Sequence, residues 1–162
     1  MKKAIFLDRD GVINVDKSYV YKIGDFEFCD GVFEALSYFQ KLGYLLIIAT
    51  NQSGIARGYY SEEDFLILSQ WMKREFLKRG IVISAIYHCP HMPEQNCECR
   101  KPKSGMFLQA IADFDIDVSH SWMIGDKQSD IDASMGAGVK NNILLGKSNV
   151  NFILDTINLI KE

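Results

Sequence analysis

Apolar and polar residues are arranged in short alternating blocks along this chain. Five apolar runs of strand length stop abruptly at polar residues or glycine, and they predict strands at residues 5–7, 44–49, 81–87, 121–125 and 142–145. Apolar residues between these runs recur three or four positions apart, which predicts helices at residues 31–42, 61–80 and 105–114, a short helix ending at 137 and an amphipathic helix at the carboxyl end. Because strands and helices alternate, we expect an α/β fold, a Rossmann-like three-layer sandwich with a mainly parallel sheet, in a single domain over residues 1–162.

Residue types at the ends of these segments support the assignment. Ser61 and Asp64 resemble a capping box in which Asp replaces the usual Glu, and Ser104 is suited to start the third helix. Residues 15–30 show no periodicity and are predicted to form a long loop over the site. Within the second helix, large apolar side chains at helical spacing predict a buried face: Phe65, Leu68, Met72 and Phe76.

The first strand ends at two acids, Asp8 and Asp10, followed by Gly11. In an open parallel sheet the ligand crevice lies beyond the carboxyl ends of the strands, and positions two apart on extended chain face the same way. Both carboxylates can therefore address one group. An isolated pair of this kind more often caps a turn, so the other strand ends must decide. The second strand delivers residues 50–54, rich in hydroxyls and amides, and the fourth delivers Asp126.

Three carboxylates gathered at one edge of a sheet repel one another unless a cation intervenes. An oxygen-only set formed by Asp8, Asp10 and Asp126 suits Mg2+, which keeps several waters and binds substrate phosphate. With the metal bound, Asp8 can attack phosphorus and Asp10 can protonate the departing alkoxide. Thr50 and Lys101 would neutralise the phosphoryl oxygens. These residues predict a phosphoryl-transfer site that works through an aspartyl-phosphate.

A second cluster lies in the loop of residues 88–100, where three thiols and one imidazole are close in sequence: Cys89, His91, Cys97 and Cys99. Such a set is closed and tetrahedral, which predicts a structural Zn2+ site with no ligand position for a substrate. The spacing departs from the common two-residue knuckle, so the alternative of cysteines buried by chance stays open. Arg100 and Lys101 follow the last ligand and are either a solvated basic pair or an anion clamp.

Composition limits the partners of such a site. The 162 residues carry a formal net charge of -3, which gives no basic field for nucleic acid or an anionic membrane. No segment is apolar for long enough to span a bilayer, and Asp8 cuts the apolar start of the chain too early for a signal peptide. We therefore expect a soluble cytoplasmic protein that binds a small molecule, and a monomer because no apolar helix is left over.

Four segments match, in order, the motifs of a known family: residues 6–11, 50–52, 100–102, and 125–127 with Asp130. They resemble the haloacid dehalogenase (HAD) superfamily of phosphatases. The resemblance implies that Asp8 is the nucleophile and Asp10 the acid and base, with Mg2+ held by Asp8, Asp126 and the backbone carbonyl of Asp10. It also implies that Thr50 and Lys101 stabilise the phosphoryl group, while Asp130 either orients a lysine or caps a helix. Only about forty residues separate Asp10 from Thr50, too few for the usual cap domain.

Within this superfamily, the zinc loop and residues 50–58 resemble the D,D-heptose 1,7-bisphosphate phosphatases and also the histidinol-phosphate phosphatases. The heptose resemblance implies removal of the C7 phosphate of D-glycero-D-manno-heptose 1,7-bisphosphate, in nucleotide-activated heptose synthesis for surface polysaccharide. The candidate substrate contacts are Asp16, Ser18, Tyr19, Asn51, Gln52, Ser53, Arg57, Arg100 and Lys127. The first three would bond sugar hydroxyls or are ordinary loop residues. The two arginines would bind a second phosphate, unless Arg57 pairs with a loop acid.

Other functions stay open at this point. Histidinol-phosphate hydrolysis is the enzyme alternative, but an imidazole-bearing cation should prefer acids in its pocket, so the arginine pair favours the bisphosphate. A phosphatase acting on nucleic acid ends shares similar motifs, and the acidic net charge argues against it. From a different class, the chain could be a zinc-stabilised binding module with a silent site, although every acid and cation that the chemistry requires is present.

Overall fold

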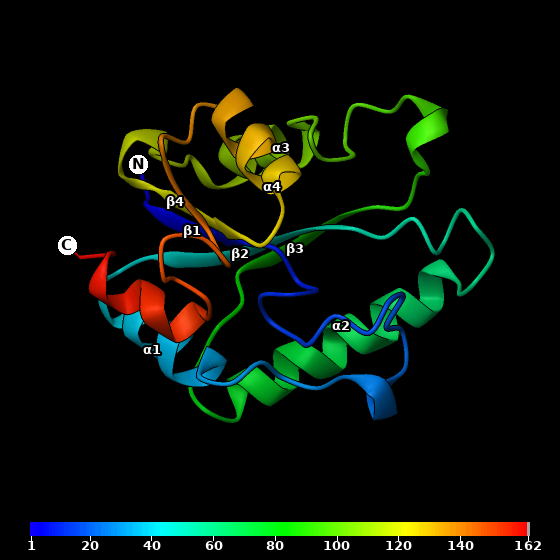
Figure 1. Ribbon diagram of the computed structural model, residues 1–162, viewed down its shortest axis with the longest axis horizontal. Helices are drawn as coiled ribbons and strands as arrows, with labels where there is room; N and C mark the ends of the chain where they lie inside the picture. Colours follow the sequence, from blue (N-terminus) through cyan, green and yellow to red (C-terminus); the bar gives the residue numbers. More distant parts are fainter. Residues whose placement is uncertain (162) are drawn as a thin grey trace.

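A five-stranded sheet forms the middle layer of the computed structural model, which describes residues 1–161 (Figure 1). Every neighbouring pair of strands is parallel, and the strand order is β3-β2-β1-β4-β5. The strands are β1 (Ala4–Leu7), β2 (Leu45–Asn51), β3 (Ala85–Cys89), β4 (Trp122–Gly125) and β5 (Asn141–Leu144). The chain builds β2 and β3 on one side of β1 and then crosses to build β4 and β5 on the other side.

Helices cover both faces of this sheet. The helices α1 (Val32–Lys41) and α2 (Glu62–Leu77) lie on one face with the 3-10 helix η4 (Ile153–Asn158), and α3 (Gly105–Phe114) and α4 (Gln128–Gly136) lie on the other (Figure 1). Three further 3-10 helices are η1 (Ile23–Asp25), η2 (Pro93–Gln95) and η3 (Val118–His120). The predicted three-layer α/β sandwich is therefore confirmed.

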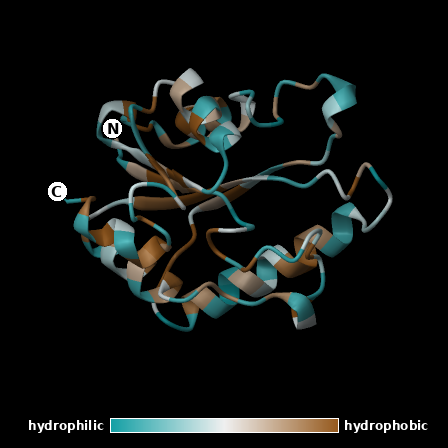
Figure 2. Ribbon diagram, in the orientation of Figure 1, coloured by the Kyte–Doolittle hydropathy of each residue, from teal (hydrophilic) through white to brown (hydrophobic). Residues whose placement is uncertain are grey.

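The central strand β1 is buried on both sides, so its alternate side chains belong to two separate cores. Ile5 and Leu7 pack in the layer beneath α1 and α2. Ala4 and Phe6 pack in the opposite layer, where the rings of Phe6 and Phe107 lie 5.1 Å apart. Figure 2 shows the strands as the most apolar part of the ribbon. A strand buried on both faces reads as a continuous apolar run, which is why the sequence pattern identifies it.

The predicted capping box and buried stripe of α2 are both present. Asp64 N donates to Ser61 Oγ at 3.0 Å, and Ser61 N donates to Asp64 Oδ2 at 2.9 Å. The stripe side chains are all buried: Phe65, Leu68, Met72 and Phe76. Ser104 does occupy the position before α3, but its hydroxyl donates to the Ala133 carbonyl at 2.7 Å and makes no capping bond.

Several predicted boundaries are wrong. The third strand begins at Ala85 and runs to Cys89, because Ile81 and Ile83 are buried without entering the sheet ladder. The second strand continues to Asn51, since its last residues pair with β3. The fourth strand begins one residue later than predicted, and the fifth is shifted by one residue at both ends. The helix expected at the carboxyl end is a 3-10 helix, in which Thr156 Oγ1 donates to the Ile153 carbonyl.

Between Asp10 and Thr50 the chain forms only η1, α1 and most of β2, so no cap domain is inserted in that described segment. None of the helices within residues 1–161 combines the length and the apolar character needed to cross a membrane. The order of the strands changes direction between β1 and β4. Ligand crevices form beyond the carboxyl ends of strands at such a switch point.

Candidate active site

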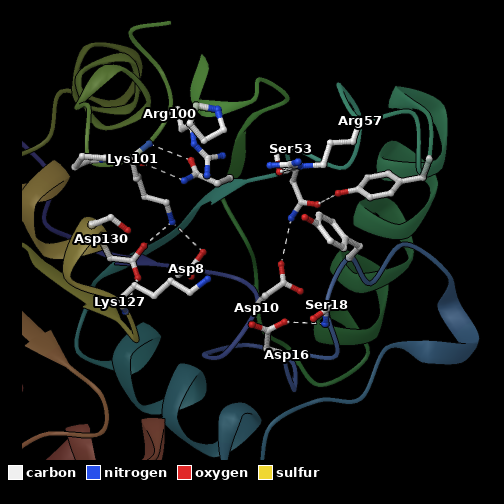
Figure 3. A pocket seen from close by; sticks show the side chains of 17 residues that line it. Asp8, Asp10, Asp16, Ser18, Ser53, Arg57, Arg100, Lys101, Lys127 and Asp130 are labelled. Carbon is white, nitrogen blue, oxygen red and sulfur yellow. Dashed lines mark hydrogen bonds and ion pairs between the residues drawn. The ribbon is translucent and has the colours of Figure 1, made fainter. Parts of the chain in front are cut away.

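A pocket of about 560 Å3 opens at this edge of the sheet (Figure 3). Its walls include all nine predicted substrate contacts and three of the predicted catalytic residues. The lining consists of Asp8, Asp10, Asp16, Ser18, Tyr19, Asn51, Gln52, Ser53, Arg57, Tyr60, Pro93, Arg100, Lys101, Pro102, Lys127, Ser129 and Asp130. Two predicted site residues, Thr50 and Asp126, are not part of this lining.

Lys101 lies between two buried carboxylates at the floor of the pocket (Figure 3). Its Nζ donates to Asp8 Oδ1 at 2.9 Å, to Asp130 Oδ1 at 2.6 Å and to the Ala49 carbonyl at 2.8 Å. Burial alone would lower the pKa of Lys101, but the charges of Asp8 and Asp130 raise it above its usual value. Lys101 is therefore a cation fixed against Asp8, where a transferring phosphoryl group would need one.

The backbone around Lys101 is fixed as well. Lys101 N donates to Asn51 Oδ1 at 3.0 Å, and Asn51 Nδ2 donates back to the Lys101 carbonyl at 3.2 Å. Asn51 ends β2, so this reciprocal pair locks the end of the zinc loop to the sheet. Asn51 is in this way a support for Lys101 as well as part of the pocket wall.

Asp130 joins the two lysine-bearing segments. Besides the bond to Lys101, its Oδ2 accepts hydrogen bonds from the backbone amides of Asp126 at 3.2 Å and Lys127 at 3.1 Å. Both roles that the sequence left open are thus present, since Asp130 orients Lys101 and caps the start of α4. Gly125 is required beside it, because a Cβ there would lie 2.4 Å from the Asp130 Cβ.

Negative charge exceeds positive charge at this floor. Burial raises the pKa of Asp8 to about 7, with Asp130 adding to the rise and Lys101 opposing it. Burial and the Asp130 charge likewise raise the pKa of Asp126 above its usual value. The Oδ1 atom of Asp126 is buried and has no hydrogen-bond partner among residues 1–161. An orphaned carboxylate oxygen beside other carboxylates is suited to a hard cation such as Mg2+.

The carboxylates that converge are Asp8, Asp126 and Asp130, whose oxygens lie within 4.8 Å of one another. Asp130 is already engaged by Lys101 and two amides, which leaves Asp8 and Asp126 as the available side-chain ligands. The Asp10 carboxylate is not in this group. The sequence resemblance implies that Asp10 joins the magnesium set through its backbone carbonyl, and that assignment stays a prediction.

Asp10 is held separately by three side-chain donors. Its Oδ1 accepts from an Nη atom of Arg9 at 3.0 Å and from Asn14 Nδ2 at 3.0 Å, and its Oδ2 accepts from Gln52 Nε2 at 3.2 Å. Gln52 Nε2 also donates to Thr50 Oγ1 at 2.9 Å. Thr50 is buried beneath Gln52, so it is placed to reach a phosphoryl group only at the base of the pocket.

The predicted sugar and phosphate contacts form the rim. Asp16 Oδ1 accepts from Ser18 N at 3.0 Å, and Ser18 and Tyr19 adopt left-handed φ angles of 62° and 56°. This local conformation presents Tyr19 to the pocket, and non-glycine residues with such angles often mark functional loops. Across the pocket, Arg57 Nε donates to Ser53 Oγ at 3.2 Å and forms no ion pair with a loop acid within the described chain.

Two residues that line the pocket, and one buried behind it, are absent from the sequence prediction. Tyr60 donates to Gln52 Oε1 and stacks on Tyr21 with ring centroids 5.1 Å apart. Ser129 lines the pocket at the start of α4. Arg9 is fully buried behind Asp10. A polar or charged residue adjacent to a motif was the only available signal, and it does not distinguish a pocket contact from a surface residue.

The four zinc-loop ligands also converge. The sulfur atoms of Cys89 and Cys97 lie 3.5 Å apart, and His91 Nδ1 lies 3.4 Å from Cys89 Sγ and 3.3 Å from Cys99 Sγ. Tetrahedral Zn2+ with sulfur and nitrogen ligands gives edges of roughly 3.5 to 3.8 Å, which three of these distances approach. The Cys89 and Cys99 sulfurs, 2.6 Å apart, would have to separate to admit an ion. The chemistry and placement of the donors fit a metal site.

Comparison with known proteins places the chain in a family. A family model described as HAD-hydrolase-like matches residues 98–149. The D-glycero-alpha-D-manno-heptose-1,7-bisphosphate 7-phosphatase of Campylobacter jejuni is 59% identical over 145 residues, covering 90% of this chain and 83% of that protein. The chain belongs to the heptose-bisphosphate phosphatase family. The D-glycero-beta-D-manno-heptose-1,7-bisphosphate 7-phosphatase of Pasteurella multocida is 49% identical over 172 residues, covering 97% of this chain and 94% of that protein.

A solved member of the heptose-bisphosphate phosphatase family has the same fold. The D,D-heptose 1,7-bisphosphate phosphatase of B. bronchiseptica, in complex with magnesium and phosphate, superposes with a TM-score of 0.86. It is 29% identical and covers 97% of each chain. The expected HAD-like architecture and the expected family are therefore confirmed.

Gly11 has no room for a side chain, and this provides a test of the metal site. Gly11 has a φ of +92°, and a Cβ there would lie 2.0 Å from Asp126 Oδ2. We expect Gly11→Ala to displace Asp126 and to raise the Kd for Mg2+ by at least about tenfold, measured by titration calorimetry.

The matched control is Gly146→Ala, since Gly146 has a φ of +91° and open space around the added Cβ. Both variants should lose about 1 kcal/mol of unfolding free energy from backbone strain. Only Gly11→Ala should also lose magnesium affinity. An unchanged Kd in a folded Gly11→Ala protein would show that Asp126 does not hold the ion.

The thiol cluster generates a second test. Cys97→Ser should abolish zinc binding and lower the melting temperature, because a loop this polar buries too little to order itself without the metal. Zinc content by mass spectrometry and thermal unfolding measure the two effects. Cys29→Ser is the matched control, since Cys29 lies outside the cluster, and it should keep its zinc. Wild-type protein that takes up no zinc when produced with excess zinc would refute the site.

Proposed function

We propose that this chain is a Mg2+-dependent phosphatase that removes the C7 phosphate of D-glycero-D-manno-heptose 1,7-bisphosphate, within nucleotide-activated heptose synthesis for surface polysaccharide. The whole chain, residues 1–162, acts as one domain in this proposal. The observation that carries it is the buried Asp8 carboxylate, fixed by Lys101 at the floor of a pocket whose rim holds further cations. Relatives of 47% to 59% identity are named for this activity.

The metal site is formed by Asp8 and Asp126 through their side chains and by Asp10 through its backbone carbonyl. Bound there, Mg2+ supplies positive charge that offsets the phosphate dianion and lets it approach a carboxylate. The orphaned Asp126 oxygen and the raised pKa values of Asp8 and Asp126 support this assignment. The B. bronchiseptica phosphatase, solved in complex with magnesium and phosphate, supports it as well.

In the first chemical step, a carboxylate oxygen of Asp8 attacks phosphorus and the bond from phosphorus to the C7 oxygen breaks. Asp10 gives its proton to that leaving oxygen, which would otherwise depart as a strongly basic alkoxide. Lys101 and Thr50 stabilise the charge that accumulates on the phosphoryl oxygens. Both Lys101 Nζ and the Arg9 amide donate to Asp8 Oδ1, so Oδ1 is held in place.

In the second step, Asp10 takes a proton from water, and the water oxygen attacks the phosphorus of the aspartyl-phosphate. The acyl phosphate bond breaks, which frees Asp8 and releases inorganic phosphate. Asp10 thus acts first as acid and then as base, and it ends protonated and ready for another substrate. Its three side-chain donors keep it directed at the same place through both steps.

The rim residues select the substrate. Arg57, Arg100 and Lys127 are three cations outside the reaction centre, with Asp16 as the one acid of the sugar-facing loop in the pocket lining. A second phosphate at C1 would satisfy such a rim, whereas the ammonium and imidazole of histidinol phosphate would be repelled. Asp16, Ser18 and Tyr19 face the sugar hydroxyls in this proposal, and Asn51, Gln52 and Ser53 complete the wall on the opposite side. The named relatives also favour the heptose substrate over histidinol phosphate.

The zinc loop positions the cationic segment. Structural Zn2+ would be held by Cys89, His91, Cys97 and Cys99. Arg100 is tied directly to two of these residues, since its amide donates to Cys97 Sγ at 3.4 Å and an Nη atom donates to the His91 carbonyl at 3.3 Å. A rigid loop fixes where Arg100 meets the substrate, while Asn51 fixes Lys101 from the other side. The metal therefore contributes to specificity through geometry alone.

The partner of the site is a phosphosugar, and we propose that neither nucleic acid nor membrane is involved. Four free cysteines suit the reducing conditions of the cytoplasm, where the enzyme would act as a monomer. A zinc-stabilised binding module without activity would have no need for Lys101 to be buried between two acids, because burying charges is costly.

The proposal is tested by turnover of heptose 1,7-bisphosphate and histidinol phosphate by the purified protein with Mg2+. We expect a clear preference for the bisphosphate, measured as kcat/KM from phosphate release. Asp8→Asn should lower kcat by at least about a thousandfold, because it removes the nucleophile. Asp25→Asn, an exposed acid in η1, is the matched control and should keep full activity. A preference for histidinol phosphate would overturn the substrate, and full activity of Asp8→Asn would overturn the mechanism.

A further inference from the structure

Arg9 is the largest side chain that is fully buried in the protein, with 2% of its surface exposed, and it does not line the pocket. Burying a guanidinium costs several kcal/mol unless its donors are satisfied. Here the cost is only partly offset, since Nε of Arg9 has no hydrogen-bond partner among residues 1–161. A buried cation with an unsatisfied donor, immediately behind the catalytic acid, calls for an explanation that the reaction steps do not give.

The contacts of Arg9 join two parts of the site. One Nη atom donates both to Asp10 Oδ1, at 3.0 Å, and to the backbone carbonyl of Val20, at 2.8 Å. Val20 is buried in the middle of residues 15–30, the loop that carries the candidate sugar contacts. A single nitrogen therefore links the acid to the loop over the site.

The other oxygen of Asp10 is linked to the same loop by a longer route. Gln52 donates to Asp10 Oδ2 and accepts from the hydroxyl of Tyr60, and Tyr60 stacks on Tyr21, the residue after Val20. The acid is thus tied on both sides to residues 20 and 21. Of these two routes to residues 20 and 21, the one through Arg9 is the direct one, because a single nitrogen makes both of its bonds.

We propose that Arg9 is a positioning residue for the leaving-group proton transfer: it fixes the Asp10 carboxylate relative to the loop that holds the leaving group. This inference rests on the proposed function, in which Asp10 protonates the C7 oxygen. Without the guanidinium, Asp10 keeps two donors, one of which also bonds the Val15 carbonyl at the start of the loop, but it loses its direct tie to Val20 in the middle of the loop. Proton transfer falls steeply when donor and acceptor are not held at hydrogen-bond distance, so the loss should appear in kcat. KM should change little, because Arg9 does not touch the pocket.

Leaving-group chemistry separates this role from a merely structural one. Hydrolysis of heptose 1,7-bisphosphate expels a strongly basic alkoxide that needs a proton, whereas p-nitrophenyl phosphate expels a weakly basic phenolate that leaves without one. In Arg9→Met we expect kcat for the bisphosphate to fall roughly tenfold to a hundredfold, and kcat for the aryl phosphate to fall less than about threefold. Arg9→Lys keeps a cation that can reach one acceptor, and it should give an intermediate loss on the bisphosphate.

A double-mutant comparison locates the effect on Asp10. In an Asp10→Asn background the acid is already absent. Adding Arg9→Lys should therefore not further change the ratio of kcat for the bisphosphate to kcat for p-nitrophenyl phosphate. Arg79→Met is the matched control for removing an arginine: its guanidinium lies 3.6 Å from the Phe33 ring centroid, outside the pocket, and the ratio should stay at the wild-type value.

Each outcome decides the inference. The positioning role of Arg9 would be overturned if kcat fell equally for both substrates in folded Arg9→Met, or if kcat fell for neither. If circular dichroism shows that Arg9→Met does not fold, the same comparison is made with Arg9→Lys: its kcat must fall more for the bisphosphate than for the aryl phosphate. If the wild type hydrolyses p-nitrophenyl phosphate but not the bisphosphate, the substrate assignment fails by itself, and glycerol phosphate then takes the place of the alkyl substrate in the same comparison.

Discussion

Three carboxylates converge where β1 and β4 end, two of them bonded to one buried lysine, and the rest of the structure serves to hold them there. Lys101 bonds Asp8 and Asp130 directly, while Asp126 lies beside them with an oxygen that no donor within residues 1–161 reaches. Burial raises the pKa of Asp8 and of Asp126, and the neighbouring Asp130 charge raises it further, because unpaired negative charge is unfavourable in a medium of low dielectric. The site is electrostatically incomplete by itself. A divalent cation held by Asp8 and Asp126, as we propose, would complete it and let a phosphate approach.

The scaffold explains how such a centre is tolerated. The parallel sheet is covered on both faces, and its two apolar layers hold β1 rigidly from either side. Glycines at positions 11 and 125 leave room for the carboxylates, and backbone amides at the start of α4 satisfy Asp130. The acids and the threonine of the proposed reaction centre therefore lie at strand ends or within three residues after them, and Lys101 reaches them from the zinc loop. Most of the groups that we propose to select the substrate lie on loops, where change is easier, and Asn51 at the end of β2 is an exception.

The sequence predicts the reaction centre better than its surroundings, for physical reasons. Buried parallel strands read as continuous apolar runs, so the places where β1 and β4 stop, at Asp8 and Asp126, can be recognised without a structure. The capping box of α2 is local and was predicted correctly as well. The start of β3 was predicted wrongly, because Ile81 and Ile83 are as apolar as the strand residues that follow them. Only the register with β2 decides where pairing begins. The roles of Tyr60 and Arg9 depend on contacts between segments far apart in the chain, and no local pattern encodes them.

The most direct test of this account is a crystal structure with Mg2+ and beryllium fluoride, which mimics a phosphoryl group bound to a carboxylate. We predict that the beryllium is bonded to a carboxylate oxygen of Asp8, with Lys101 in contact with a fluoride and Mg2+ between Asp8 and Asp126. A mimic bound to Asp10, or lodged away from both acids, would contradict the account.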